Sequence, residues 1–188
     1  MSLRLLAVAA SLRRGSLNRK LLGNAVAAAR RAGAEVVEAE FAEFDLPAFN
    51  ADVQEVSGFP PGAIRFRERL EAADGLLLAS PEYNYSMPGA LKNLIDWVSR
   101  MRPVPFRGRS ALLLATSNGP IGGIRGLWQL RIPLEGLGMF VHPDMFSLPA
   151  GGQALGEDGM LTDPKVAERL QGLVEGYVRA ARALAARE

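Results

Sequence analysis

Residues 75–97 read GLLLASPEYNYSMPGALKNLIDW, in which an unbroken apolar run leads through a polar, aromatic loop into an amphipathic segment. The run at 75–80 has the length of one strand, and its lack of charged positions is typical of a strand buried on both faces of a sheet. Pro88 stands where a helix can begin, because the first turn of a helix does not need its missing N–H. The apolar residues that follow recur at helical spacing: Leu91, Leu94, Ile95 and Val98. A buried strand followed by an amphipathic helix is the repeating unit of an α/β protein.

The same alternation continues in both directions along the chain. Strands are predicted over residues 3–9, 34–40, 75–80, 110–116 and 138–142. Helices are predicted over 18–32, 61–73, 88–101 and 122–136, and a last helix begins near Thr162 or Asp163. This pattern predicts one α/β domain over residues 1–188, a three-layer sandwich whose five-stranded parallel sheet has the order 2-1-3-4-5 with helices on both faces. The segments 41–60 and 143–162 are predicted as long surface loops.

The composition excludes several classes of site and partner. The balance of 22 Lys and Arg against 20 Asp and Glu is too even for a typical nucleic-acid binder. The absence of cysteine excludes disulfides, thiolate metal sites and cysteine nucleophiles, and a single histidine, His142, cannot form a histidine metal cluster. The apolar run near the N-terminus is too short to span a membrane and lacks a secretory layout. We therefore expect a cytoplasmic protein with no metal and neither nucleic acid nor membrane as partner.

Three loops are expected to meet in one crevice. In an open α/β sheet of this order, ligands bind outside the carboxyl ends of the strands, at the switch point between the first and third strands. The loops that follow the first, third and fourth strands contain SLRRGSLNRKLL (11–22), PEYNYSMPG (81–89) and TSNGPIGG (116–123). They are rich in glycine, hydroxyl and amide groups, so the crevice is the candidate binding site.

The loop at 11–22 is suited to an anion. Ser11, Ser16 and Asn18 offer side-chain donors, the start of the helix offers its positive dipole end, and Arg13 offers a planar fork that fits a phosphate. The expected ligand carries a terminal phosphate and is not a nucleoside triphosphate, since the GxxxxGK[ST] pattern of a triphosphate site is missing. A purely structural role stays open, in which Ser16 or Asn18 caps the helix. The other cations of the loop are expected to face solvent: Arg14, Arg19 and Lys20.

The loop at 81–89 is suited to a flat ring. Two tyrosines flank Asn84, and a planar heteroaromatic ring would rest against Tyr83, Asn84, Tyr85 and Ser86. With these residues the chain resembles the NAD(P)H-dependent FMN reductases of flavodoxin-like fold, and among them the bacterial quinone and chromate reductases. The resemblance covers nearly the whole chain, and PEYNYSMPGALKNLIDW (81–97) is its most specific part.

The resemblance implies a set of cofactor-binding residues and a reaction. It implies that the FMN phosphate is held by Ser11, Arg13, Ser16 and Asn18. It implies that the isoalloxazine ring and ribityl chain are lined by Pro81, Glu82, Tyr83, Asn84, Tyr85 and Ser86, and that the ring site is completed by Ser117, Gly119, Gly122 and Gly123. Tyr85, where many relatives have glycine, favours the quinone-reducing branch. The implied enzyme takes a hydride from NADPH or NADH and passes two electrons to a quinone or similar acceptor in a ping-pong cycle, as a homodimer or homotetramer.

No side chain is predicted to be catalytic, because hydride transfer by a flavin needs no general base. Glu82 is expected to accept hydrogen bonds from nearby amides, and His142 to be structural. Trp97 and Met101 are expected either in the peripheral core or in a subunit contact. Two other functions stay open: a flavodoxin-type electron carrier, which the slightly basic charge disfavours, and a protein that binds a phosphate ligand other than a flavin.

Overall fold

A parallel sheet with the predicted strand order lies at the centre of the computed structural model, which describes residues 2–186. Its strands run in the order β2-β1-β3-β4-β5, and β6 also pairs with β4. Every pair is parallel. The strands are β1 (Arg4–Ala9), β2 (Glu35–Ala39), β3 (Gly75–Ala79), β4 (Ser110–Thr116), β5 (Phe140–Val141) and β6 (Phe146–Leu148). The predicted order 2-1-3-4-5 is confirmed.

Two short strands share the fifth position of the sheet. β5 pairs with Ser110 and Ala111 at the start of β4, and β6 pairs with the end of the same strand from Leu114 to Thr116. Pro143 lies between the two short strands and has no N–H to donate to a ladder, so pairing is interrupted there. The prediction of one strand over 138–142 was therefore incomplete, because the pairing resumes inside the segment predicted as a loop.

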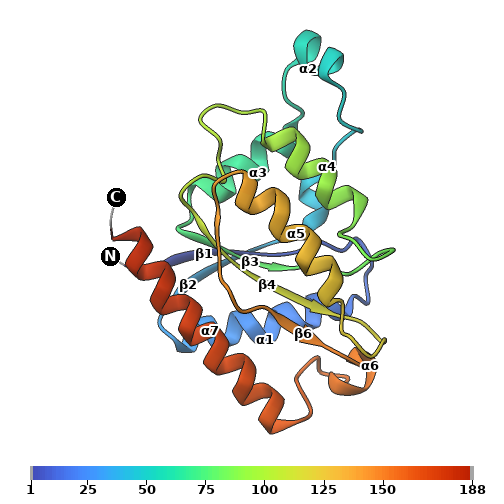
Figure 1. Ribbon diagram of the computed structural model, residues 1–188, viewed down its shortest axis with the longest axis vertical. Coiled ribbons are helices and arrows are strands. Elements are labelled where there is room, and N and C mark those ends of the chain that lie inside the picture. Colours follow the sequence, from blue (N-terminus) through green and yellow to red (C-terminus); the bar gives the residue numbers. More distant parts are fainter. Residues whose placement is uncertain (1, 187–188) are drawn as a thin grey trace.

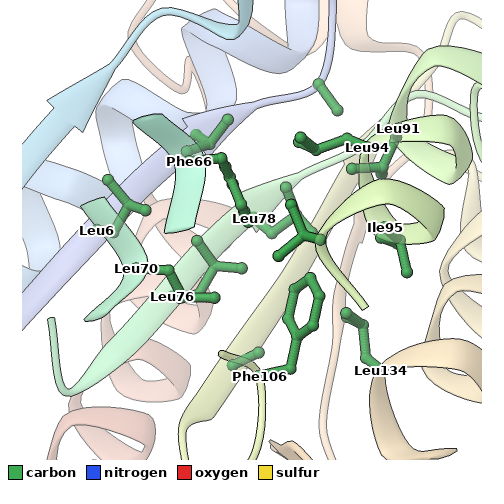
Figure 2. Close-up of a cluster of buried hydrophobic side chains, with 14 of the residues drawn as sticks. Leu6, Phe66, Leu70, Leu76, Leu78, Leu91, Leu94, Ile95, Phe106 and Leu134 are labelled. Carbon is green, nitrogen blue, oxygen red and sulfur yellow. The ribbon is translucent and has the colours of Figure 1, made fainter. Parts of the chain in front are cut away.

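Helices cover both faces of the sheet (Figure 1). One layer contains α1 (Leu17–Arg31) and α7 (Pro164–Ala185), and the other contains α3 (Pro61–Glu71), α4 (Gly89–Val98) and α5 (Ile124–Gly136). Alternate residues of the central strands point to opposite layers, so Leu76 and Leu78 pack with α3 and α4 while Leu77 packs with α1 and α7. Figure 2 shows the first of these clusters, in which side chains from strands and helices meet: Leu6, Phe66, Leu70, Leu76, Leu78, Leu91, Leu94, Ile95, Phe106 and Leu134.

The two predicted surface loops contain short elements that the periodicity did not reveal. Segment 41–60 holds a 3-10 helix, η1 (Phe41–Phe44), and α2 (Ala51–Ser57), which the side chain of Asn50 caps by accepting from the N–H of Asp52 at 2.9 Å. Segment 143–162 holds β6 and α6 (Gly151–Ala154). α2 has no buried residue and stands apart from the other helices in Figure 1. Elements this short are too brief to show a hydrophobic period.

Trp97 and Met101 are core residues. Both side chains are almost fully buried, and the indole N–H of Trp97 donates to the carbonyl oxygen of Pro47 at 2.9 Å. Of the two roles that the sequence left open for this pair, the structure supports core packing. Across residues 2–186 there is no helix with the length and apolar character needed to cross a membrane.

Candidate functional site

The three predicted loops lie at the same edge of the sheet, because β1, β3 and β4 are parallel neighbours. Beyond the ends of these strands, the N–H of Ala10 donates to the oxygen of Ala79, and the N–H of Ser80 donates to the oxygen of Leu114, each at 2.8 Å. These bonds extend the ladder to the first residues of the loops. The loops therefore begin side by side, as the topological switch point requires.

The first loop presents the donor set that a phosphate needs. Ser16 is the N-cap of α1, and its Oγ accepts from the N–H of Arg19 at 3.4 Å. Ser11 is buried just after β1, whereas Arg13 is exposed. The N–H of Arg19 is thus bonded to Ser16, and the first turn of α1 also carries the positive end of the helix dipole. A Cβ on Gly15 would meet nothing within 4 Å, so the loop is open. The residues present fit a terminal phosphate.

Asn18 has a structural task that the sequence did not reveal. Its side-chain amide donates to the oxygen of Thr116 and accepts from the N–H of the same residue, each at 3.0 Å. Both groups are buried, so Asn18 ties the start of α1 to the end of β4. One amide hydrogen and the backbone N–H of Asn18 remain for an anion. The predicted role as a phosphate ligand thus stays a prediction, beside an observed role in joining two loops.

Arg19 and Lys20 were expected to face solvent, and this was wrong. Arg19 donates to the oxygen of Ser11 at 3.2 Å and forms an ion pair of 2.7 Å with Glu40, just after β2. Lys20 donates to the oxygen of Gly156 at 3.1 Å. Sequence reasoning missed both contacts because Glu40 and Gly156 are distant along the chain. The result is that the first loop is held from two sides.

The second loop is a tight two-residue hairpin turn. The N–H of Tyr83 donates to the oxygen of Ser86 at 2.9 Å, and the N–H of Ser86 donates back to the oxygen of Tyr83 at 3.0 Å. Asn84 and Tyr85 occupy the two central positions with φ of 49° and 67°, as a type I′ turn demands. Tyr83 and Tyr85 are 54% and 68% exposed, so their rings are accessible. Pro81 is buried at the base of this loop.

Glu82 joins the second loop to α5. Its side chain is only 8% exposed, and it accepts from Nε of Arg125 at 2.7 Å and from the N–H of Gly126 at 3.1 Å. Burial alone would raise the pKa of Glu82, but the hydrogen bonds from Arg125 and Gly126 and the charge of Arg125 outweigh it and hold the pKa below its usual value. The expectation that Glu82 accepts from a nearby amide is confirmed at Gly126, and the bond with Arg125 is an addition to it.

The third loop is shaped by two glycines. Gly122 and Gly123 have φ of 61° and 88°, which side chains rarely allow. A Cβ on Gly122 would lie 2.6 Å from the carbonyl carbon of Leu148, and one on Gly123 would lie 3.0 Å from Cβ of Ala115. Ser117 and Gly119 are half-buried nearby. Packing and backbone conformation thus explain why glycine stands at positions 122 and 123, and contact of these two residues with a flavin ring stays a prediction.

The loops that follow β1, β3 and β4 thus start side by side at the switch point of a doubly wound sheet. This fold defines the class: a flavodoxin-like α/β protein, a class in which ligands bind at the switch point.

Comparison with known proteins is consistent with this class. Residues 3–153 match the model of the NADPH-dependent FMN reductase family. An NAD(P)H-dependent FMN reductase of Pseudomonas aeruginosa is 40% identical over 173 residues, which are 90% of each chain. A probable NADPH:quinone oxidoreductase of Oryza sativa is 36% identical over 186 residues, which are 92% of this chain and 86% of that protein. The solved structure of the flavoenzyme NAD(P)H:(acceptor) oxidoreductase FerB from Paracoccus denitrificans superposes with a TM-score of 0.81 at 31% identity and covers 96% of this chain and 97% of that one.

The chain belongs to the NADPH-dependent FMN reductase family. It is therefore an oxidoreductase, with FMN as its cofactor and NAD(P)H as electron donor. Sequence reasoning placed the three loops correctly. It missed Arg125, although this residue lies only two positions after the glycine pair, because its partners Glu82 and Tyr85 are distant in sequence.

Proposed function

We propose that this protein transfers two electrons from NAD(P)H, by way of FMN, to quinones or similar acceptors. When bound, FMN supplies the redox chemistry: it accepts a hydride from NAD(P)H and passes two electrons to the acceptor. The observation that supports the proposal is that the loop with Ser11 and Ser16 and the hairpin with the exposed tyrosines follow β1 and β3, which are neighbouring parallel strands at the switch point. Relatives that reduce quinones support the choice of acceptor.

In this proposal the first loop holds the phosphate and the other two loops hold the ring. The phosphate contacts are made by Ser11, Arg13, Ser16 and Asn18. The ring and the ribityl chain lie against residues 81–86, and the turn formed by Ser117, Gly119, Gly122 and Gly123 closes the site from the other side. In this proposal, backbone groups of the hairpin, whose central residues Asn84 and Tyr85 have φ of 49° and 67°, bind the polar edge of the ring.

No side chain of the crevice is proposed as a general base. Glu82, the one carboxylate in these loops, is held by Arg125 and Gly126, so its lone pairs are already engaged. Its lowered pKa keeps it ionised and bound to Arg125 at neutral pH. The chain would contribute the positioning of the bound FMN, and FMN would supply the chemistry.

An electron carrier remains the alternative, and kinetics separate it from the enzyme. A nicotinamide and a quinone that use one exposed face in turn give parallel double-reciprocal lines when quinone is varied at several NAD(P)H concentrations. The FMN-loaded protein should lose its visible flavin absorbance when NAD(P)H is added without oxygen. Absence of this bleaching with both NADH and NADPH would refute the reductase and favour the carrier.

Calorimetric titration tests the phosphate site. FMN should bind far more tightly than riboflavin, which lacks the dianion, and more tightly than FAD, which continues beyond it. Equal affinity for riboflavin and FMN would remove the role given to residues 11–18.

We further propose that the protein works as a homodimer or homotetramer in the cytoplasm, where NAD(P)H is supplied. Two large apolar side chains of α5, Trp128 and Ile132, are four residues apart on one helix face and are 54% and 65% exposed. Val56 of α2 is also exposed. Light scattering should give a mass of two or four chains, and a Trp128→Glu variant should shift it toward one chain. A monomeric parent protein would refute the association.

A further inference from the structure

The first loop has few contacts that hold its shape. Within residues 2–186, the backbone N–H groups of residues 12–15 donate no hydrogen bond. Only one side chain in the same part of the chain bonds to the backbone of residues 11–15: Nη2 of Arg19 donates to the oxygen of Ser11 at 3.2 Å. N–H groups without a partner can bind an anion, but they leave the loop without internal support. Arg19 is therefore the side chain that ties this loop to the rest of the fold.

Arg19 is anchored to the neighbouring strand. Its Nη1 lies 2.7 Å from Oε2 of Glu40, the residue after β2, and β2 pairs with β1. One guanidinium thus joins the loop after β1 to the end of β2. The side chain also borders a cavity of about 150 Å³ that Ala39 and Phe41 help to line. Packing does not enclose the guanidinium on every side, so its polar contacts fix its place.

Stability alone does not explain this arrangement. The side chains of Arg19 and Glu40 are 31% and 65% exposed, and an ion pair this open contributes little to the free energy of folding. The Nε of Arg19 is buried and has no hydrogen-bond partner within residues 2–186, which opposes burial of the guanidinium. A side chain held in this way beside a binding loop is a reason to look for a role in the shape of that loop.

We infer that Arg19 is a positioning residue for the FMN phosphate: with Glu40, it holds residues 11–16 in the shape that receives the phosphate before FMN binds. The inference rests on the proposed function, in which this loop binds the phosphate. Arg19 need not touch FMN, because its two Nη groups already bind Ser11 and Glu40. A loop that is ordered beforehand loses less conformational entropy on binding, so the affinity for FMN is higher.

A direct attraction between the Arg19 charge and the phosphate is the rival explanation, and a Glu40→Ala variant separates the two. This variant removes a negative charge near the loop and leaves the charge of Arg19 unpaired. If the charge acted directly, FMN would bind more tightly. If the pair holds the loop, FMN should bind about two- to fivefold more weakly, because Arg19 loses its anchor.

Calorimetric titration with FMN and with riboflavin measures the effect of Arg19 itself. Arg19→Gln should weaken FMN binding about three- to tenfold, and it should leave riboflavin binding within about twofold of the parent, because riboflavin has no phosphate. A general structural loss would weaken both. Arg19→Lys keeps a donor for one of the two partners and should lie between Arg19→Gln and the parent. Adding Glu40→Ala to Arg19→Gln should weaken FMN binding no further, because the two residues act as one unit.

Arg30 and Glu38 provide the matched control. Arg30 lies near the other end of α1 and also joins this helix to β2, since its Nη2 lies 3.0 Å from Oε1 of Glu38 and 3.1 Å from the oxygen of Val36. The same two elements are therefore joined by the same kind of contacts, away from the loop. Arg30→Gln and Glu38→Ala should leave the affinity for both flavins within about twofold of the parent.

Limited proteolysis of the FMN-free protein tests the loop without any flavin. Trypsin cleaves after arginine, and Arg13 and Arg14 lie in the loop. Mass spectrometry locates the cleavage sites. Cleavage after these two residues should be about three- to tenfold faster in Arg19→Gln than in the parent or in Arg30→Gln, because the loop opens more often.

Four results would overturn the inference. They are an unchanged FMN affinity in Arg19→Gln, an equal loss of FMN and riboflavin affinity in that variant, unchanged or tighter FMN binding in Glu40→Ala, and equal loop cleavage in Arg19→Gln and Arg30→Gln. If the parent binds FMN and riboflavin equally, the proposed phosphate site fails, and the cleavage rates still decide whether Arg19 holds the loop. None of these measurements uses turnover, so a failure to reduce quinones would refute the proposed acceptor and leave this test intact.

Discussion

Replacing Asn18 by alanine should destabilise the protein even when no FMN is bound. The amide of Asn18 makes two buried hydrogen bonds to the backbone of Thr116, each 3.0 Å long. Alanine removes both and leaves a buried N–H and a buried carbonyl oxygen without these partners. A buried group left unsatisfied costs about 1–3 kcal/mol, so we expect a loss of about 2–4 kcal/mol in the free energy of unfolding. For a chain of this size that corresponds to a melting temperature lower by about 5–15 °C.

Urea denaturation of the FMN-free protein, followed by circular dichroism, measures this change. Asn118→Ala is the control, because Asn118 is exposed and its side chain accepts one bond, from the N–H of Gly152 at 3.0 Å. Water can replace that bond, so the control should lose less than about 1 kcal/mol. The reasoning is refuted if Asn18→Ala unfolds like the parent without FMN and only its FMN affinity falls, because the side chain would then act on the phosphate alone.

Three further predictions concern the same loops. Arg13→Ala should weaken FMN binding about ten- to a hundredfold, because a charge-assisted contact is lost, while Arg14→Ala should have little effect. If calorimetric titration gives the same small effect for both variants, the loop is only the solvated start of a helix and does not bind the phosphate. Gly122→Ala should lower the free energy of unfolding, measured by urea denaturation, by about 2–4 kcal/mol, because Gly122 has a φ of 61° and a Cβ there would lie 2.6 Å from the backbone. Gly119→Ala is the control and should be tolerated, because its Cβ would meet only a side-chain oxygen at 3.6 Å. In the folded state the pKa of Glu82 lies below its unfolded value of 4.5, so ionised Glu82 contributes fully to the free energy of unfolding above pH 4.5 and loses this contribution as the pH falls through the lowered pKa. The difference in free energy of unfolding between the parent and Glu82→Gln should therefore become smaller in acid. A difference that stays constant with pH would contradict this.

The order of the sheet was predictable because burial on both faces leaves a clear mark in the sequence. β3 and β4 are buried at every position, and GLLLA and SALLLAT are the continuous apolar runs that such strands need. The edge of the sheet was harder to predict. β5 has two residues and β6 has three, and runs this short carry no period that separates a strand from a loop.

The loops of the site were predictable for a different reason. Parallel strands that are neighbours deliver their carboxyl ends to one edge, so the strand order alone predicted that the loops after β1, β3 and β4 would meet. The cap of α1 was also readable, because a serine at the start of a helix bonds to N–H groups only a few residues away, as Ser16 does.

What the sequence by itself determined is therefore whatever depends on neighbours along the chain: burial pattern, helix starts, turn residues and the place of the crevice. Only the tertiary structure decided the contacts between loops. Asn18 meets Thr116, Arg19 meets Glu40, and Glu82 and Tyr85 meet Arg125 across 98, 21, 43 and 40 positions of the chain. A long polar side chain at such a site has many possible partners, and which one it finds depends on how the strands bring the loop ends together and on the local register of each turn. Helical spacing and alternation describe one element at a time, so they carry no information about these pairings.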